Sequence, residues 1–170
     1  MTVKKIAILS PGDMGHAVGQ ALSEHGFELL TCLAGRSDRT GALARDAGFR
    51  ISETLNELMV EADLLLSILV PANAETVAQE IAHSLQETGE STLIADCNAI
   101  SPMRSEYISR IIESAGGRYI DASIIGHPPG RGVPPRFYVS GQYADAMLDL
   151  DGKGIAVKAL GSDIGRASGI

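Results

Sequence analysis

The 170 residues, 45% hydrophobic and 21% charged, have the size and composition of one folded domain rather than of a disordered segment. A net charge of −7 argues against general affinity for nucleic acids or membrane surfaces, and no apolar run approaches the roughly 20 residues that span a bilayer. Aromatic residues make up only 4% and tryptophan is absent, so we expect an aliphatic core of the kind found in parallel α/β sheets.

The two cysteines, Cys32 and Cys97, are too few for a disulfide framework or a metal motif. We expect two reduced thiols and no metal site, although the sequence leaves a single bridge open. Lys4 and Lys5 precede only four apolar residues before the turn at Pro11, which predicts no signal peptide and a cytoplasmic location.

The first half of the chain alternates short apolar runs with segments of helical periodicity. Residues 3–9 form a buried-strand pattern that stops at Ser10-Pro11-Gly12, and residues 14–25 repeat apolar side chains at helical spacing up to Gly26. The next predicted elements are a strand at 27–34, a helix at 38–47, a short strand at 49–51, a helical turn opening at Ser52 and a strand at 64–70.

The second half continues the same alternation. The predicted elements are a helix at 74–85, a strand at 91–95, a helix at 102–114, strands at 119–125 and 136–140, and a last strand at 155–160. Residues 126–135, rich in proline and glycine, are expected to be a loop. We therefore predict an α/β fold, a Rossmann domain over residues 1–170 whose doubly wound sheet is mostly parallel, with the later strands allowed to be mixed.

A glycine-containing turn separates the first strand from the first helix. Gly12 and Gly15 fill the second and third positions of the dinucleotide fingerprint, whereas Ser10 replaces the first glycine. Such a turn brings backbone amides and a helix N-terminus against a diphosphate. We expect five consecutive residues to bind it: Pro11, Gly12, Asp13, Met14 and Gly15. The alternative is an ordinary strand–helix turn.

The end of the second predicted strand distinguishes NAD from NADP in this type of site. An acidic residue there would bind a ribose 2′-hydroxyl and repel a 2′-phosphate, but Arg36 stands in its place. Arg36, Ser37, Arg39 and Thr40 offer guanidinium and hydroxyl donors to a phosphate, while Asp38 is better explained as a cap of the next helix. We predict NADP as the cofactor, with NAD as the lesser choice; two solvated arginines are the alternative.

Five segments of the chain resemble the 6-phosphogluconate dehydrogenase and 3-hydroxyisobutyrate dehydrogenase superfamily of β-hydroxyacid dehydrogenases. They are the turn from Ile8 to Gly15 with its Met-Gly pair, Gly35-Arg36-Ser37, Leu69-Val70-Pro71, the segment from Asp96 to Pro102, and the segment from Asp121 to His127. The resemblance covers essentially the whole chain as the N-terminal NAD(P)-binding domain of that family. The C-terminal helical domain of the family is absent from these 170 residues.

The resemblance also implies roles for residues outside the fingerprint. Val70, Pro71 and Asn98 would lie beside the nicotinamide end of the cofactor, and Asn98 and His127 are candidate substrate contacts. Asn98-Ala99 and His127 depart from the family's residues, so the substrate need not be a simple 3-hydroxy acid. No residue matches the family's catalytic lysine, and we expect the chain alone to be inactive.

The remaining histidine, cysteine and aspartate side chains that could carry chemistry are expected to have structural roles. We expect surface or capping positions for His16, His25 and His83, a core position for Cys97, and turn-capping roles for Asp96 and Asp121.

The leading function is therefore an NADP(H)-dependent oxidoreductase acting on a small molecule, with this chain supplying the cofactor-binding domain. An imine reductase-like enzyme and a non-catalytic NADP-binding or assembly module are the alternatives. We also expect a homodimer, formed through the second domain or through apolar surface left uncovered near Ile124, Ile125 and the last strand.

Overall fold

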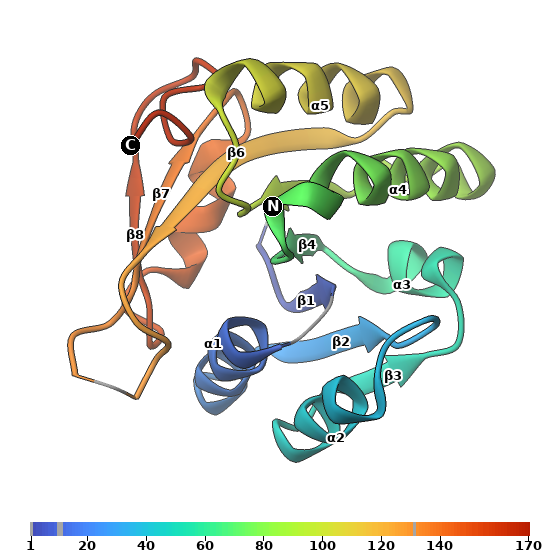
Figure 1. Ribbon diagram of the computed structural model, residues 1–170, viewed down its shortest axis with the longest axis vertical. Coiled ribbons are helices and arrows are strands. Elements are labelled where there is room, and N and C mark those ends of the chain that lie inside the picture. Colours follow the sequence, from blue (N-terminus) through green and yellow to red (C-terminus); the bar gives the residue numbers. More distant parts are fainter. Residues whose placement is uncertain (1, 10–11, 131) are drawn as a thin grey trace.

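The sheet is the centre of the computed structural model, which describes residues 2–9, 12–130 and 132–170. Within these residues eight strands join in the order β3-β2-β1-β4-β5-β6-β7-β8 (Figure 1). The strands are β1 (Lys5–Leu9), β2 (Glu28–Cys32), β3 (Arg50–Ser52), β4 (Leu64–Ser67), β5 (Leu93–Asp96), β6 (Arg118–Ile125), β7 (Arg136–Ser140) and β8 (Ala156–Ala159). Every neighbouring pair is parallel except β6 and β7.

Helices cover both faces of this sheet. They are α1 (Asp13–Glu24), α2 (Asp38–Asp46), α3 (Leu55–Glu61), α4 (Ala74–Thr88) and α5 (Pro102–Ser114), with short 3₁₀ helices η1 (Pro71–Asn73) and η2 (Ala144–Leu150). Buried residues of α1, α2 and η2 pack on one face, and those of α3, α4 and α5 pack on the other. No helix in the described part of the chain is long and apolar enough to cross a membrane.

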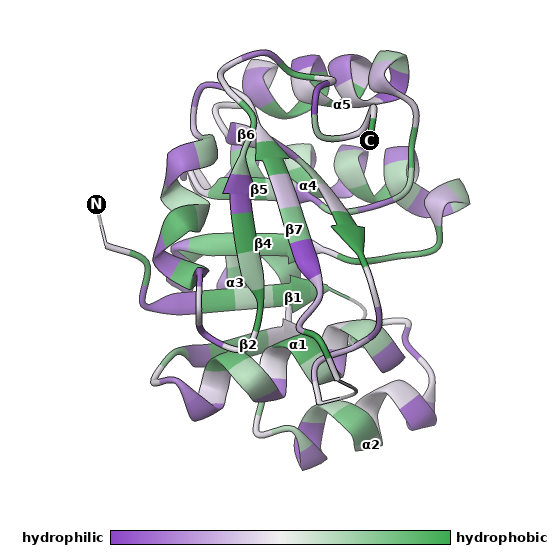
Figure 2. Ribbon diagram, turned by 90° about the vertical axis from the view of Figure 1, so that its left-hand side faces the viewer, coloured by the Kyte–Doolittle hydropathy of each residue, from purple (hydrophilic) through white to green (hydrophobic). Residues whose placement is uncertain are grey.

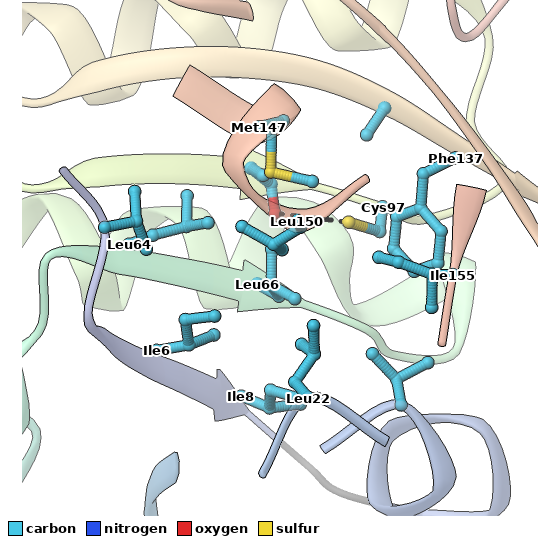
Figure 3. Close-up of a cluster of buried hydrophobic side chains, with 14 of the residues drawn as sticks. Ile6, Ile8, Leu22, Leu64, Leu66, Cys97, Phe137, Met147, Leu150 and Ile155 are labelled. Carbon is cyan, nitrogen blue, oxygen red and sulfur yellow. Dashed lines mark hydrogen bonds between the residues drawn. The ribbon is translucent and has the colours of Figure 1, made fainter. Parts of the chain in front are cut away.

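Successive side chains of the central strands point alternately into the two core layers, as the two-residue period of a strand requires. Ile6 and Ile8 point to the layer with α1, whereas Ala7 and Leu9 point to the layer with α4. Figure 3 shows part of the first layer, where Met147, Phe137 and the strand side chains meet. In Figure 2 hydrophobic colour prevails on the central strands, whereas the helices around them carry both hydrophobic and hydrophilic segments.

The predicted α/β order is confirmed, and so is the mixed character of the later strands. The strands at 27–34 and 64–70 are shorter than predicted, because the chain leaves the sheet after Cys32 and Ser67 to form turns at the sheet edge. The 3₁₀ helix η2 was not predicted; its buried residues Ala144, Met147 and Leu150 cover the strands next to it. Residues 126–135 form the expected loop in the part that the structure describes.

The expectation that the last strand leaves apolar surface uncovered is wrong. Ile155 is 1% exposed and Val157 is 7% exposed, because both pack in the core layer that contains Phe137 and Met147. Ile125, at the end of β6, is exposed at 44%.

Asp121 joins the C-terminal segment to the sheet. Its buried carboxylate on β6 accepts hydrogen bonds from Ser105 on α5 (2.8 Å) and Ser140 on β7 (3.1 Å). The backbone N–H of Gly165 (2.8 Å) and both the N–H and the hydroxyl of Ser168 (3.0 Å each) donate to the same side chain. A buried carboxylate is tolerated only with such partners, so the segment 165–168 is an integral part of the domain.

Gly154 packs the turn between η2 and β8 against α1, and its substitution gives a test of the packing. Its φ is +88°, and a Cβ would lie 2.6 Å from Cβ of Ala21, a side chain too short to turn away. We expect Gly154→Ala to lower the free energy of unfolding by about 2–4 kcal/mol, from left-handed strain together with overpacking. Gly161, with a φ of +100° and open space within 4 Å of the position that a Cβ would take, is the matched control.

Gly161→Ala should cost only the strain, about 1–2 kcal/mol. Denaturant unfolding of the three proteins measures both values, and an equal loss in the two variants would contradict tight packing of Gly154 on Ala21.

Candidate functional site

The carboxyl ends of β1, β2, β4 and β5 lie at one edge of the sheet because these strands are parallel. β2 lies on one side of β1 and β4 on the other, so the connections after β1 and β4 lead to opposite faces. Open α/β sheets bind ligands in the crevice that forms at such a point. Among the described residues, the segments that border it are residue 12 at the start of α1, 33–37, 68–73 and 97–101.

The N-terminus of α1 faces this edge without a side-chain cap. Gly12 is its N-cap residue and makes no side-chain cap hydrogen bond, whereas Ser37, Thr54 and Ser101 cap α2, α3 and α5. Gly15 is buried in the first turn of the helix. The start of α1 therefore has the chemistry of an anion site, with backbone amides and the positive end of the helix dipole. Of the predicted fingerprint residues, Pro11 lies outside the described part of the chain.

Arg36 lines a cleft of about 270 Å³ between the segment after β2 and the start of α4. The opposite wall consists of residues that the sequence analysis did not predict, namely Asn73, Thr76, Val77 and Glu80. The only sequence signal for them was their position in a helix that starts at the same edge of the sheet as Arg36.

The other predicted phosphate ligands surround the start of α2. The Ser37 side chain caps the helix by accepting from the Thr40 N–H (3.2 Å), and the two hydroxyl oxygens are 3.0 Å apart. Arg39 donates to the Asp13 carboxylate across 2.8 Å. Ser37, Arg39 and Thr40 thus belong to the N-cap and first turn of α2, and their contact with a phosphate stays a prediction.

Asn98 connects the segment after β5 with the segment after β4. Its Oδ1 accepts from the Leu69 N–H (2.6 Å), its Nδ2 donates to Ser67 Oγ (3.2 Å), and its own N–H donates to Asp96 Oδ1 (2.9 Å). At 2% exposure, this side chain positions the loop beside it. Its contact with a cofactor or substrate stays a prediction.

The loop after β4 presents two of the predicted cofactor contacts. Val70 is 64% exposed, and the exposed Pro71 begins η1. Because Asn98 holds the N–H of Leu69, these two residues are displayed from an anchored backbone.

None of the four histidines, all of which lie in the described part of the chain, takes part in the contacts that Asn98 makes with the segments after β4 and β5. His127 is exposed on the loop after β6, and the same loop lies against α1, where Pro129 and Gly130 line a cleft of about 260 Å³. His16 Nδ1 is 2.8 Å from the Gly12 carbonyl oxygen, His25 Nδ1 is 2.7 Å from the Ala21 carbonyl oxygen, and His83 pairs with Glu87. A substrate role for His127 stays a prediction.

Cys32 and Cys97 are free and buried, and the core position expected for Cys97 is confirmed. Burial raises the pKa of the Cys97 thiol well above its usual value, with the carboxylates of Asp96 and Asp121 adding to the effect. A neutral thiol is a poor nucleophile, so Cys97 is a core residue.

Asp96 ends β5 and accepts the Asn98 N–H, which is the turn-capping role predicted for it. The pKa of this carboxyl is raised to about 6, mainly by burial and to a smaller extent by the Asp121 charge, while the hydrogen bonds from Asn98 oppose the rise. Above pH 6 the folded protein must therefore hold a poorly solvated charge at the end of the strand.

The raised pKa of Asp96 predicts that replacing this residue with asparagine stabilises the protein by an amount that depends on pH. Between about pH 4 and 6 the folded state binds a proton that the unfolded state releases, so stability contributed by this group falls as the pH rises. Asp96→Asn removes the charge and retains the acceptor for the Asn98 N–H. We expect it to raise the free energy of unfolding by about 1–3 kcal/mol at pH 8 and by almost nothing at pH 4.

Denaturant unfolding at the two pH values measures this gain. Glu53→Gln, at an exposed acid between β3 and α3, should produce no gain at either pH. A gain from Asp96→Asn that is equal at pH 4 and pH 8 would show that charge burial is not its cause.

Comparison with known proteins identifies the family. Residues 5–146 match the model of the NAD binding domain of 6-phosphogluconate dehydrogenase. A curated relative from Methanothermus fervidus, described only as an uncharacterized 28.5 kDa protein, is 25% identical over 166 residues. These residues are 96% of this chain and 61% of that protein, so the chain spans about three fifths of the relative's length.

Solved structures repeat the fold. A conserved protein of unknown function, described as structurally similar to 3-hydroxyacid dehydrogenases, has a TM-score of 0.84 and 25% identity over 96% of this chain and 60% of its own. An imine reductase from Myxococcus stipitatus in complex with NADP⁺ has a TM-score of 0.75 and 19% identity over 97% of this chain and 57% of its own. With the sheet order, the uncapped turn at Gly12 and a family match over most of its length, the chain belongs to the family of NAD-binding domains of 6-phosphogluconate dehydrogenase.

Proposed function

We propose that residues 1–170 form one domain that binds NADP(H) for an oxidoreductase of the 6-phosphogluconate and 3-hydroxyisobutyrate dehydrogenase type. The observation that carries the choice of NADP(H) is Arg36, which lines the cleft at the end of β2 where an NAD-selective site would place an acidic residue. The family match supports dinucleotide binding, whereas the choice of a cofactor that carries a 2′-phosphate rests on Arg36.

The residues present fit such a cofactor from one end to the other. The diphosphate would lie on the backbone amides between Gly12 and Gly15, where no side chain caps α1. The adenine would enter the cleft of about 270 Å³ beside Arg36, with Thr76 and Val77 on its far wall. A 2′-phosphate on the same nucleoside would then lie over the first turn of α2.

That turn offers the donors that a phosphate requires. The hydroxyls of Ser37 and Thr40 lie 3.0 Å apart at its start, the Arg39 guanidinium contacts Asp13, and Arg36, just before it, lines the cleft toward α4. Charge-assisted hydrogen bonds from guanidinium to phosphate are among the stronger polar contacts of proteins, which makes this turn the source of NADP(H) preference.

The reacting end of the cofactor would lie near the segments after β4 and β5. The exposed Val70 and Pro71 would pack beside the nicotinamide ribose, on a loop that Asn98 holds in place. The nicotinamide supplies the hydride, and the protein must supply its orientation and a group that exchanges the substrate's proton.

The proton-exchanging group is proposed to come from outside these residues. The four lysines of the chain are Lys4, Lys5, Lys153 and Lys158, and none lies in the segments after β1, β2, β4 or β5. A small-molecule substrate would meet the cofactor beside Asn98 and the loop of His127. We also propose that the protein is cytoplasmic and that it associates with a second copy near the exposed Ile125.

An imine-reducing activity is the second candidate. Asn98-Ala99 and His127 stand where hydroxyacid enzymes of the family have other residues, which favours a substrate other than a simple 3-hydroxy acid. A non-catalytic NADP-binding module would use the same cleft and the same arginines.

Separate titrations of NADPH and NADH test the proposal. The wild-type chain should bind NADPH more tightly, because only NADPH engages Arg36 through a second phosphate. Arg36→Asp should weaken NADPH by about 10–100-fold, the loss of one or two charge-assisted hydrogen bonds, and should change NADH by less than about threefold. The fluorescence of the reduced nicotinamide reports binding of both nucleotides.

Arg110→Asp is the matched control, because it makes the same charge reversal at an exposed site on α5. It should leave both affinities unchanged. Equal wild-type affinity for the two nucleotides, or an equal loss of both on Arg36→Asp, would refute the preference for NADP(H).

A further inference from the structure

An ion pair joins the two walls of the proposed ribose site. Arg39 Nη2 lies 2.8 Å from Asp13 Oδ1, and the two side chains are 69% and 70% exposed. Asp13 is in the first turn of α1 and Arg39 in the first turn of α2. The contact therefore connects the diphosphate turn with the segment that would recognise a 2′-phosphate.

The topology fixes this contact over the path of the nucleotide. β1 and β2 pair in parallel, with Ile6 beside Leu29, so the turns that follow them are neighbours at the sheet edge. A dinucleotide with its diphosphate at Gly12 and its adenine beside Arg36 must place the adenosine ribose between those turns. The ion pair lies across the same interval.

A 2′-phosphate is a stronger partner for Arg39 than the Asp13 carboxylate. Exposed ion pairs contribute little to stability, so this pair can open without disturbing the fold. A phosphate monoester carries about −1.5 to −2 charges at neutral pH, against one for a carboxylate, and offers three acceptor oxygens. The capped start of α2, with Ser37 bound to the Thr40 N–H, holds the Arg39 backbone in place during the exchange.

We propose that Asp13 sets the ratio between NADP(H) and NAD(H) binding by competing with the 2′-phosphate for Arg39. The inference rests on the proposed function. NAD(H) binds with the Asp13–Arg39 pair intact, whereas the 2′-phosphate of NADP(H) takes Arg39 over from Asp13. Asp13 is thus a specificity-determining residue that restrains the preference of the site for the second phosphate.

A different role for Asp13 makes a different forecast. An acidic residue in the first turn of a helix is stabilised by the helix dipole, and it also repels a diphosphate bound at the same helix end. Both of these effects act equally on NADPH and NADH, and neither requires Arg39. The quantity that separates the two roles is the ratio of the two affinities, with and without Arg39.

A double-mutant cycle measures that ratio. NADPH and NADH are titrated into the wild-type 170-residue chain, Asp13→Asn, Arg39→Ala and the double variant. In the presence of Arg39, Asp13→Asn should raise the preference for NADPH by about two- to fivefold, the range expected for breaking an exposed ion pair. In the Arg39→Ala background the same substitution should raise the ratio by less, because only the direct repulsion between the Asp13 carboxylate and the 2′-phosphate remains.

Asp38→Asn is the matched control, since it removes an exposed acid that is next to Arg39 in sequence and also in the first turn of α2. Its effect on the ratio should be the same in the wild-type and Arg39→Ala backgrounds. An unchanged ratio in Asp13→Asn, or an equal change in both backgrounds, would overturn the competition while NADPH binding through Arg36 stands. Binding of neither nucleotide to the wild-type chain would overturn the proposed function as well.

Discussion

Parallel pairing of β1 with β2 on one side and β4 on the other is the constraint on which the candidate site depends. Ile6 is the register partner of both Leu29 and Leu64, so one short strand fixes the level at which its two neighbours end. The connections after β1 and β4 then lead to opposite faces of the sheet, and a crevice lies between them. The fingerprint turn, the arginine segment and the loop before α4 meet there because of this pairing, although 58 positions separate Ile6 from Leu64 in the sequence.

Buried polar groups give this edge its fixed shape. Asn98 connects Ser67, Leu69 and the turn at Asp96, and each of its bonds satisfies a group that would otherwise lie unpaired near the core. The cost appears at Asp96, whose carboxylate is held where water reaches it poorly. A position that family resemblance assigns to ligand contact therefore has a structural use of its own, and the two uses are compatible, because an anchored loop loses little freedom when a cofactor binds.

The order of elements could be predicted well because each carries its own period and stop signals. The run from Leu64 and the turn at Gly12 are examples of local patterns that need no tertiary information. The wall of the cleft opposite Arg36 could not be predicted in this way, since Thr76 and Val77 read as ordinary residues of an amphipathic helix until the sheet places them. The burial of Ile155 escaped prediction for a similar reason: it shares its core layer with η2, whose buried residues repeat every three positions, a spacing that matches neither the 3.6-residue period of an α-helix nor the two-residue period of a strand.

The carboxylate of Asp121 accepts hydrogen bonds from donors that are far apart in the sequence. Two of the five hydrogen bonds come from Ser105 and Ser140, and the other three come from Gly165 and Ser168. A chain cut before residue 165 would therefore leave this buried carboxylate with two hydrogen-bond donors in place of five. Residues 165–168 thus contribute to the stability of the sheet itself, because without them an acidic side chain on β6 would lose most of its partners.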